Sequence, residues 1–345
     1  MPAIGRKFRG VALAAALLLL AGSAPAWADI VPGGDSGSEG EVGGGSGDDG
    51  TINASAGAVV YDHSENGSGQ AAGPVVSATD WTPPACYYAP ALGPDELKAE
   101  LEPIWEAEST GPEWDAAQRD RYVNGNPYKD FNKEKEGEGY WWDGFIPDGR
   151  IGDPGALDCQ EPYFWVDTDD DPPADIPQAI TPEMLAQLAY AELRVPSTEV
   201  SLAPEVETKV NLPTWAWLDG ATFKPVSVTA SVLLLGMEAT TTAEPVSLRI
   251  EPGTADAELH PGSGECAITD GRIGEPYAKG KADRTPPCGV TYLRSSGDGT
   301  FQLQATITWK IHWTGTGVAK EQPLPDGTFG ADQAVTVQEI QAINR

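Results

Sequence analysis

The stretch Phe301–Trp313 alternates between apolar and polar side chains without exception. The apolar positions are Phe301, Leu303, Ala305, Ile307, Trp309, Ile311 and Trp313; the polar ones are Gln302, Gln304, Thr306, Thr308, Lys310 and His312. A strict period of two predicts a β-strand with one buried and one solvated face. At about 3.3 Å per residue the strand is about 43 Å long. It therefore needs neighbouring strands of similar length and a second layer over its apolar face.

The chain after Pro196 contains several more segments of this kind. Strands are predicted at 210–219, 226–234, 246–250, 290–293 and from 335 to about 343, with Gly- and Pro-containing turns between them. Short strands at this spacing are typical of an antiparallel β-sandwich. We predict a mainly β chain in which residues 196–345 form the sandwich.

The first 28 residues have the features of a signal peptide. Basic residues precede an apolar run from Val11 to Ala21, and Ala-Trp-Ala at 26–28 places small residues before a cleavage site. The alternative, a transmembrane anchor, needs about 20 apolar residues. We therefore expect export and cleavage before Asp29, which leaves no membrane span in the mature chain.

Residues 29–80 are rich in Gly, Ser, Asp and Glu. This composition predicts a disordered acidic linker. Removal of the signal peptide takes away three of the 22 basic residues and no acid, so the mature charge is 19 − 52 = −33. Such a charge argues against nucleic acid as a partner.

The four cysteines are predicted to form two disulfides. An even number of cysteines in an exported chain favours disulfides over a metal site, which needs closer Cys or His spacing. Three pairings are possible. We favour Cys86–Cys159 and Cys266–Cys288 because each bond then links residues of one region.

Residues 81–195 are predicted to be a small α+β region held by Cys86–Cys159 and containing one or two helices. One helix begins near Gly93 and is kinked or ended by Pro103. Thr181-Pro182-Glu183 predicts the start of a second helix. Two short aromatic strands are expected at 140–142 and 163–165.

The segment Cys288–Tyr292, the turn Gly297–Gly299 and the strand from Phe301 resemble the last strands of PKD-type immunoglobulin-like domains. The resemblance implies an immunoglobulin-like sandwich whose core is flanked by Tyr292 and Phe301. The stretch Leu248–Gly253 departs from the family because it lacks the central Asp-Gly pair.

The chain is also similar to a group of uncharacterised secreted proteins of actinobacteria. The similarity covers roughly residues 160–345 and is carried by Pro182–Ala186, Val210–Asp219, Cys266 and Cys288–Tyr292. It implies export and a C-terminal β domain, and it implies no particular chemistry.

The sequence indicates no catalytic residue, no metal site and no cofactor. Its three histidines are His63, His260 and His312, and it contains neither His-Glu-x-x-His nor Gly-x-Ser-x-Gly. The acids at 167 and 169–171 resemble part of a calcium loop but lack its glycine and distal glutamate, so a solvated linker is favoured. A glycosidase pair needs only two acids at the right distance, and nothing singles out two of 52.

The aromatic side chains are the best indication of function. Trp141, Trp142 and Trp165 are candidates for stacking on a sugar ring, although tryptophans also fill small cores. Trp141 and Trp142 are adjacent, so on a strand they point in opposite directions and one of them is expected to be exposed.

These observations favour a secreted, non-enzymatic module for binding or structure. Its expected partner is an extracellular glycan or a cell-surface protein. The alternative is a glycan- or cell-wall-directed hydrolase whose acids the sequence does not reveal. The sequence does not indicate an oligomeric state.

Overall fold

The computed structural model describes residues 59–68, 72–107, 109–168, 170–205, 207–218, 223–269, 272–281 and 284–340. The predicted signal peptide and the predicted linker up to residue 58 lie outside these residues. No helix among the described residues is long and apolar enough to cross a membrane.

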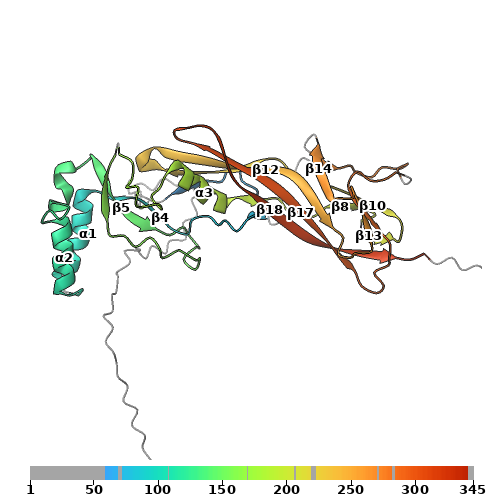
Figure 1. Ribbon diagram of the computed structural model, residues 1–345, viewed down its shortest axis with the longest axis horizontal. Coiled ribbons are helices and arrows are strands. Elements are labelled where there is room, and N and C mark those ends of the chain that lie inside the picture. The colour runs from blue at the N-terminus through green and yellow to red at the C-terminus, as the bar shows by residue number, and fades with distance from the viewer. Residues whose placement is uncertain are drawn as a thin grey trace, which may run out of the picture. The chain divides into compact units, whose positions relative to one another are not determined.

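A long antiparallel sheet contains the alternating stretch (Figure 1). Its strands follow the order β1–β11–β12–β17–β18–β3. They are β1 (Val60–Asp62), β11 (Val226–Val232), β12 (Met237–Glu251), β17 (Phe301–Gly315), β18 (Val318–Gln338) and β3 (Val76–Ser77). The short β9 (Glu207–Lys209) runs parallel to the end of β18. The long strand thus has neighbours of similar length on both sides, as predicted.

The two faces of β17 differ as the alternation predicts. Its apolar side chains from Leu303 to Trp313 are buried, and Phe301 is half-buried. The polar side chains between them are exposed or half-buried. His312 lies on this polar face, 3.9 Å from Glu321.

A second group of strands closes on the same core as the long sheet. It consists of β8 (Ser201–Ala203), β10 (Pro213–Leu218), β13 (Ala257–His260), β14 (Glu265–Thr269), β15 (Arg272–Gly274) and β16 (Gly289–Tyr292). β14 belongs to both groups because it pairs with β12 and then with β15. The Cys266–Cys288 disulfide joins β14 to the residue before β16. Tyr292 stacks on Phe301, with ring centroids 5.4 Å apart.

The region with Cys86–Cys159 is built on a three-stranded sheet of β4 (Tyr87–Leu92), β5 (Gly139–Phe145) and β6 (Phe164–Asp167). A separate small core lies on one face, formed with α1 (Pro94–Glu106), α2 (Pro112–Tyr122) and the short 3-10 helix η1 (Asp130–Lys135). Side chains on the other face belong to the main core.

Helix α1 buries Leu97, Leu101 and Trp105 on one face, the spacing that the sequence indicates. Pro103 lies inside it and does not end it, because the helix continues for three more residues to Glu106. With α2, the described part of residues 81–195 contains three α-helices instead of one or two. The sequence of α2 is polar, with only Asp115 and Tyr122 buried, and lacks an apolar stripe.

Helix α3 (Pro182–Glu192) begins as predicted, with the Thr181 hydroxyl accepting a hydrogen bond from the Met184 amide at 3.1 Å. It packs on β11, β12 and β17, and Thr241 donates to the Ala186 carbonyl at 2.8 Å. The predicted division at residues 195 and 196 therefore does not separate two cores, since α3 covers the long sheet.

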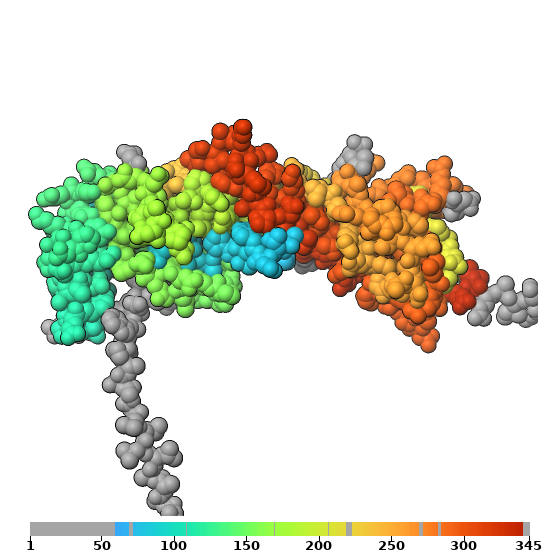
Figure 2. Space-filling view, viewed as in Figure 1, coloured from blue at the N-terminus to red at the C-terminus, as the bar shows by residue number. Residues whose placement is uncertain are grey.

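The predicted linker of residues 29–80 extends too far. Val60–Asp62 pairs with β11, Val76–Ser77 pairs with β18, and β2 (Gly73–Pro74) pairs with β7 (Arg194–Val195). Figure 2 shows this blue segment lying beside the red β17–β18 strands. Short strands can bind a sheet edge through their backbone without an apolar pattern of their own, which is why composition did not reveal them.

Candidate functional site

The proposed stacking residues Trp141, Trp142 and Trp165 do not form an exposed platform. Trp141 is completely buried and Trp142 is 3% exposed. They point to opposite faces of the three-stranded sheet, as expected, but each face is covered by a core. The expectation that one of them is exposed is therefore wrong. Trp165 is half-buried, and its indole N–H donates to Asp167 at 2.6 Å.

The indole of Trp81, which the sequence did not single out, is half-buried and packs on the main core. It borders a groove of about 300 Å³ between the 75–83 segment and the end of α3. The groove is lined by Val75, Val76, Ser77, Thr79, Asp80, Trp81, Thr82, Pro83, Tyr190 and Ala191. We call it the Trp81 groove. Trp81 meets the Tyr190 ring edge-on, with centroids 5.0 Å apart.

Tyr190 lines the Trp81 groove and carries a buried polar group. The residue is 2% exposed, and its hydroxyl has no hydrogen-bond partner among the described residues. Burial raises the pKa of Tyr190 to about 12; Ser77 is near enough to lower it slightly, although no hydrogen bond joins the two hydroxyls. A buried hydroxyl without a partner is costly.

Glycine at position 327 allows this groove to form. A Cβ at Gly327 in β18 would collide with the Val75 side chain and the Tyr190 hydroxyl. The bare backbone therefore lets the 75–77 segment lie against β18 while Tyr190 lies beneath it.

A second pocket of about 200 Å³ lies beside the tip of the β11–β12 hairpin, where the short helix η2 (Leu233–Leu235) connects the strands. It is lined by Tyr140, Trp142, Val166, Asp167, Thr168, Asp170, Asp171, Pro172, Ile180, Leu235 and Met237. We call it the Leu235 pocket. The acidic run of the sequence thus forms one of its walls. Asp169 lies outside the described residues.

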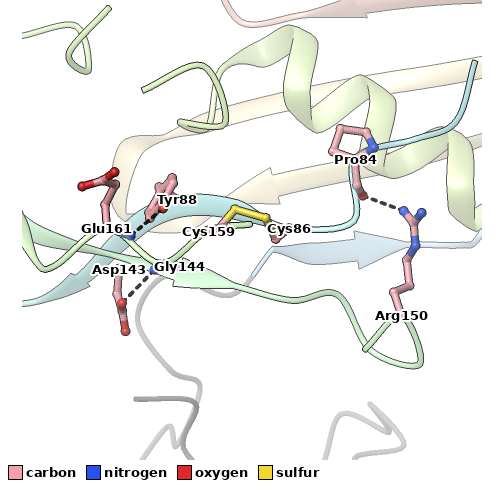
Figure 3. Close-up of a disulfide and its surroundings, with 8 residues drawn as sticks. All are labelled: Pro84, Cys86, Tyr88, Asp143, Gly144, Arg150, Cys159 and Glu161. Atoms are coloured by element: carbon pink, nitrogen blue, oxygen red, sulfur yellow. Dashed lines mark hydrogen bonds between the residues drawn. A yellow bond between two sulfur atoms is a disulfide. The ribbon is translucent and has the colours of Figure 1, made fainter. Parts of the chain in front are cut away.

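Two carboxyl groups and a tyrosine meet where α1 faces β5. The Tyr163 hydroxyl donates to Glu100 at 2.8 Å. Asp143 accepts a hydrogen bond from the Gly144 amide at 2.8 Å, near the Cys86–Cys159 disulfide (Figure 3). Burial, with the Glu100 carboxylate adding to it, raises the pKa of Asp143 to about 6. Burial also raises the pKa of Tyr163.

Both predicted disulfides are present, Cys86–Cys159 and Cys266–Cys288. In the part of the chain that the structure describes, no group of three or more His, Cys, Asp or Glu side chains is arranged to hold a metal ion. No protein-family model matches the sequence, and no curated protein or solved structure is significantly similar to it.

Sequence reasoning missed Trp81 and the Glu100–Tyr163–Asp143 cluster for different reasons. Trp81 has no strand or helix pattern around it in the sequence, so nothing predicted its partner Tyr190, which lies more than 100 residues later. The three cluster residues come from α1, β5 and the segment before β6, and only the fold brings them together.

Proposed function

We propose that the protein is an extracellular, non-enzymatic binding module that holds a glycan in the Trp81 groove. The half-buried Trp81 ring, which lines the groove, is the observation that carries this proposal. The C–H face of a sugar ring packs well on an indole, and its hydroxyl groups need hydrogen-bonding partners. The hydroxyl-bearing residues Ser77, Thr79 and Thr82 line the same groove.

An extracellular location is part of the proposal. Disulfides form and persist in oxidising compartments, and all four cysteines of this chain are paired. The sequence of residues 1–28, which has the features of a signal peptide, also supports export. The relationships to secreted actinobacterial proteins and to PKD-type domains remain predictions from sequence.

The test is a titration with soluble cell-wall and plant polysaccharides, followed by calorimetry and tryptophan fluorescence. Trp81→Ala should weaken glycan binding about tenfold or more. Trp217→Ala is the matched control, because Trp217 is also a half-buried indole but lies on β10, away from the groove. Equal binding by wild type and Trp81→Ala, or equal weakening in both variants, would contradict the proposal.

A second candidate function is the glycan- or cell-wall-directed hydrolase. The Glu100–Tyr163–Asp143 cluster favours it, because a general acid needs a carboxyl pKa near the working pH and a second acid nearby. Chromatography of the incubated polysaccharides distinguishes the two functions. Release of shorter products that Asp143→Asn abolishes would support the hydrolase, and retention without products would support the binding module.

A further inference from the structure

The Leu235 pocket has an apolar floor and one apolar wall. Trp142, Val166 and Ile180 form the floor and are almost completely buried. Leu235 and Met237, at the tip of the hairpin, are half-buried and form the wall. A space of about 200 Å³ between them is suited to one apolar side chain rather than to an extended ligand.

The opposite wall is negatively charged. Asp167 also lines the pocket, but Lys135 lies 3.0 Å from its carboxylate and balances its charge. Asp170 and Asp171 are exposed and take part in no ion pair among the described residues. Two uncompensated carboxylates therefore stand at the mouth of an apolar pocket, where they attract cations and repel anions.

The apolar surface continues beyond the pocket at the hairpin tip. Leu233, two residues before Leu235, is 76% exposed. Single exposed leucines are common on protein surfaces, but this one stands in the same short helix as Leu235, which lines the pocket. Together they offer an apolar contact next to a negative rim.

We propose that the Leu235 pocket binds a peptide segment of a partner protein in which an apolar side chain is flanked by lysine or arginine. Charge complementarity selects this occupant. A second copy of this chain would bring its own large negative charge, −30 for the full sequence, to the same rim. An anionic membrane surface would be repelled in the same way.

The site is independent of the Trp81 groove, since the two share no lining residue. A variant that loses peptide binding should therefore still bind glycan, and a variant that loses glycan binding should still bind peptide. The protein would hold a glycan at one site and a basic peptide at another.

The experiment measures fluorescence anisotropy of a labelled synthetic peptide, Gly-Ser-Lys-Leu-Lys-Ser-Gly, titrated with the mature protein. Two companion peptides replace the leucine by serine or both lysines by glutamate. Wild type should bind the Lys-Leu-Lys peptide at least about ten times more tightly than either companion. Equal binding of the three peptides, or no binding at millimolar protein, would overturn the proposal.

Protein variants test the two walls separately. Asp170→Asn/Asp171→Asn should weaken binding and reduce its salt dependence, and Leu235→Ser should weaken it with the salt dependence kept. The matched control is Glu258→Gln/Asp298→Asn, which removes two exposed acids from β13 and a turn distant in sequence. If the control weakened binding as much as the pocket variants did, the peptide would be attracted by the overall negative charge of the protein. The assignment of the Leu235 pocket as its binding site would then be wrong.

Sedimentation velocity tests the other occupant. Self-association of wild type that Leu235→Ser abolishes would show that a second copy fills the pocket, and this would overturn the peptide proposal. Near-ultraviolet circular dichroism of each variant shows whether it keeps the native fold.

Discussion

β5 and β17 each contain two tryptophans, and the two strands bury them in different ways. On β17, Trp309 and Trp313 are four residues apart and lie on the same buried face. On β5, Trp141 and Trp142 are adjacent, lie on opposite faces and are both buried. The spacing along a strand thus shows which face a side chain occupies, but only the surrounding elements decide whether that face is covered.

The largest expected effect tests the burial of β5. Trp141→Ala should lower the free energy of unfolding by about 3–5 kcal/mol, because it empties a core position. It also removes the indole donor that bonds the Phe131 carbonyl at 3.1 Å. Urea denaturation measures this loss. Trp165→Ala, at a half-buried position on β6, is the control and should cost clearly less; equal costs would mean that β5 is open on the helical side.

The second prediction tests the one-sided burial of β17. Ile307→Ala should cost about 2–5 kcal/mol through lost burial and a cavity. Its neighbour Thr306 lies on the polar face and is half-buried, so Thr306→Ala should cost about 0.5 kcal/mol or less. Chemical denaturation of both variants measures the two losses of stability. Similar losses would contradict the assignment of Ile307 to the buried face and Thr306 to the polar face.

The third prediction concerns a charge in the covered region around β5. The ordinary pKa of an aspartate is 3.8, and that of Asp143 is raised to about 6 in the folded protein. The folded state therefore binds this proton more tightly than the unfolded state between these values. The stabilisation that the protonated Asp143 carboxyl contributes is fully present below about pH 4, and it is lost as the pH rises through about 6.

Asp143→Asn should remove this pH-dependent loss. At pH 7 to 8 the variant should be more stable than wild type, by at most about 3 kcal/mol. Thermal unfolding from pH 4 to 8 measures the difference, with the exposed Glu258→Gln as control. If wild type and Asp143→Asn kept parallel pH profiles, the buried charge at Asp143 would be ruled out.

The smallest effect concerns the strands added at the sheet edges. A chain that starts at Trp81 lacks β1 and β3 and the packing of Tyr61 and Val75 on the main core. It should be less stable than a chain that starts at Val59, by about 2 kcal/mol. Equal melting temperatures of the two chains in calorimetry would show that these strands do not contribute to stability.

The sequence predicts the elements whose patterns are complete within themselves. The alternation of β17, the start of α3 at Thr181 and the pairing of both disulfides are confirmed. β1 and β3 could not be predicted because two- and three-residue strands are held by backbone bonds to a distant partner. α2 could not be predicted because it buries little of its surface.

The candidate sites were less predictable than the fold. Each one combines residues from elements far apart in the sequence, such as Trp81 with Tyr190, or Asp170 with Leu235. Their side chains are ordinary for a strand, a helix or a loop, so local pattern carries no signal of them. Burial without a partner, as at the Tyr190 hydroxyl, becomes visible only in three dimensions.

The pairing of Val76 with Thr328 joins positions 252 residues apart. A ribosome adds roughly 5–20 residues per second, so Val76 is made on the order of ten seconds to a minute before its partner strand exists. During this time β3 has no edge to bind, although β1 can already pair with β11, and the sheet can be completed only after β18 has been synthesised. At this edge the order of synthesis and the order of folding are therefore opposite, and β3, which is made early, is among the last strands to pair.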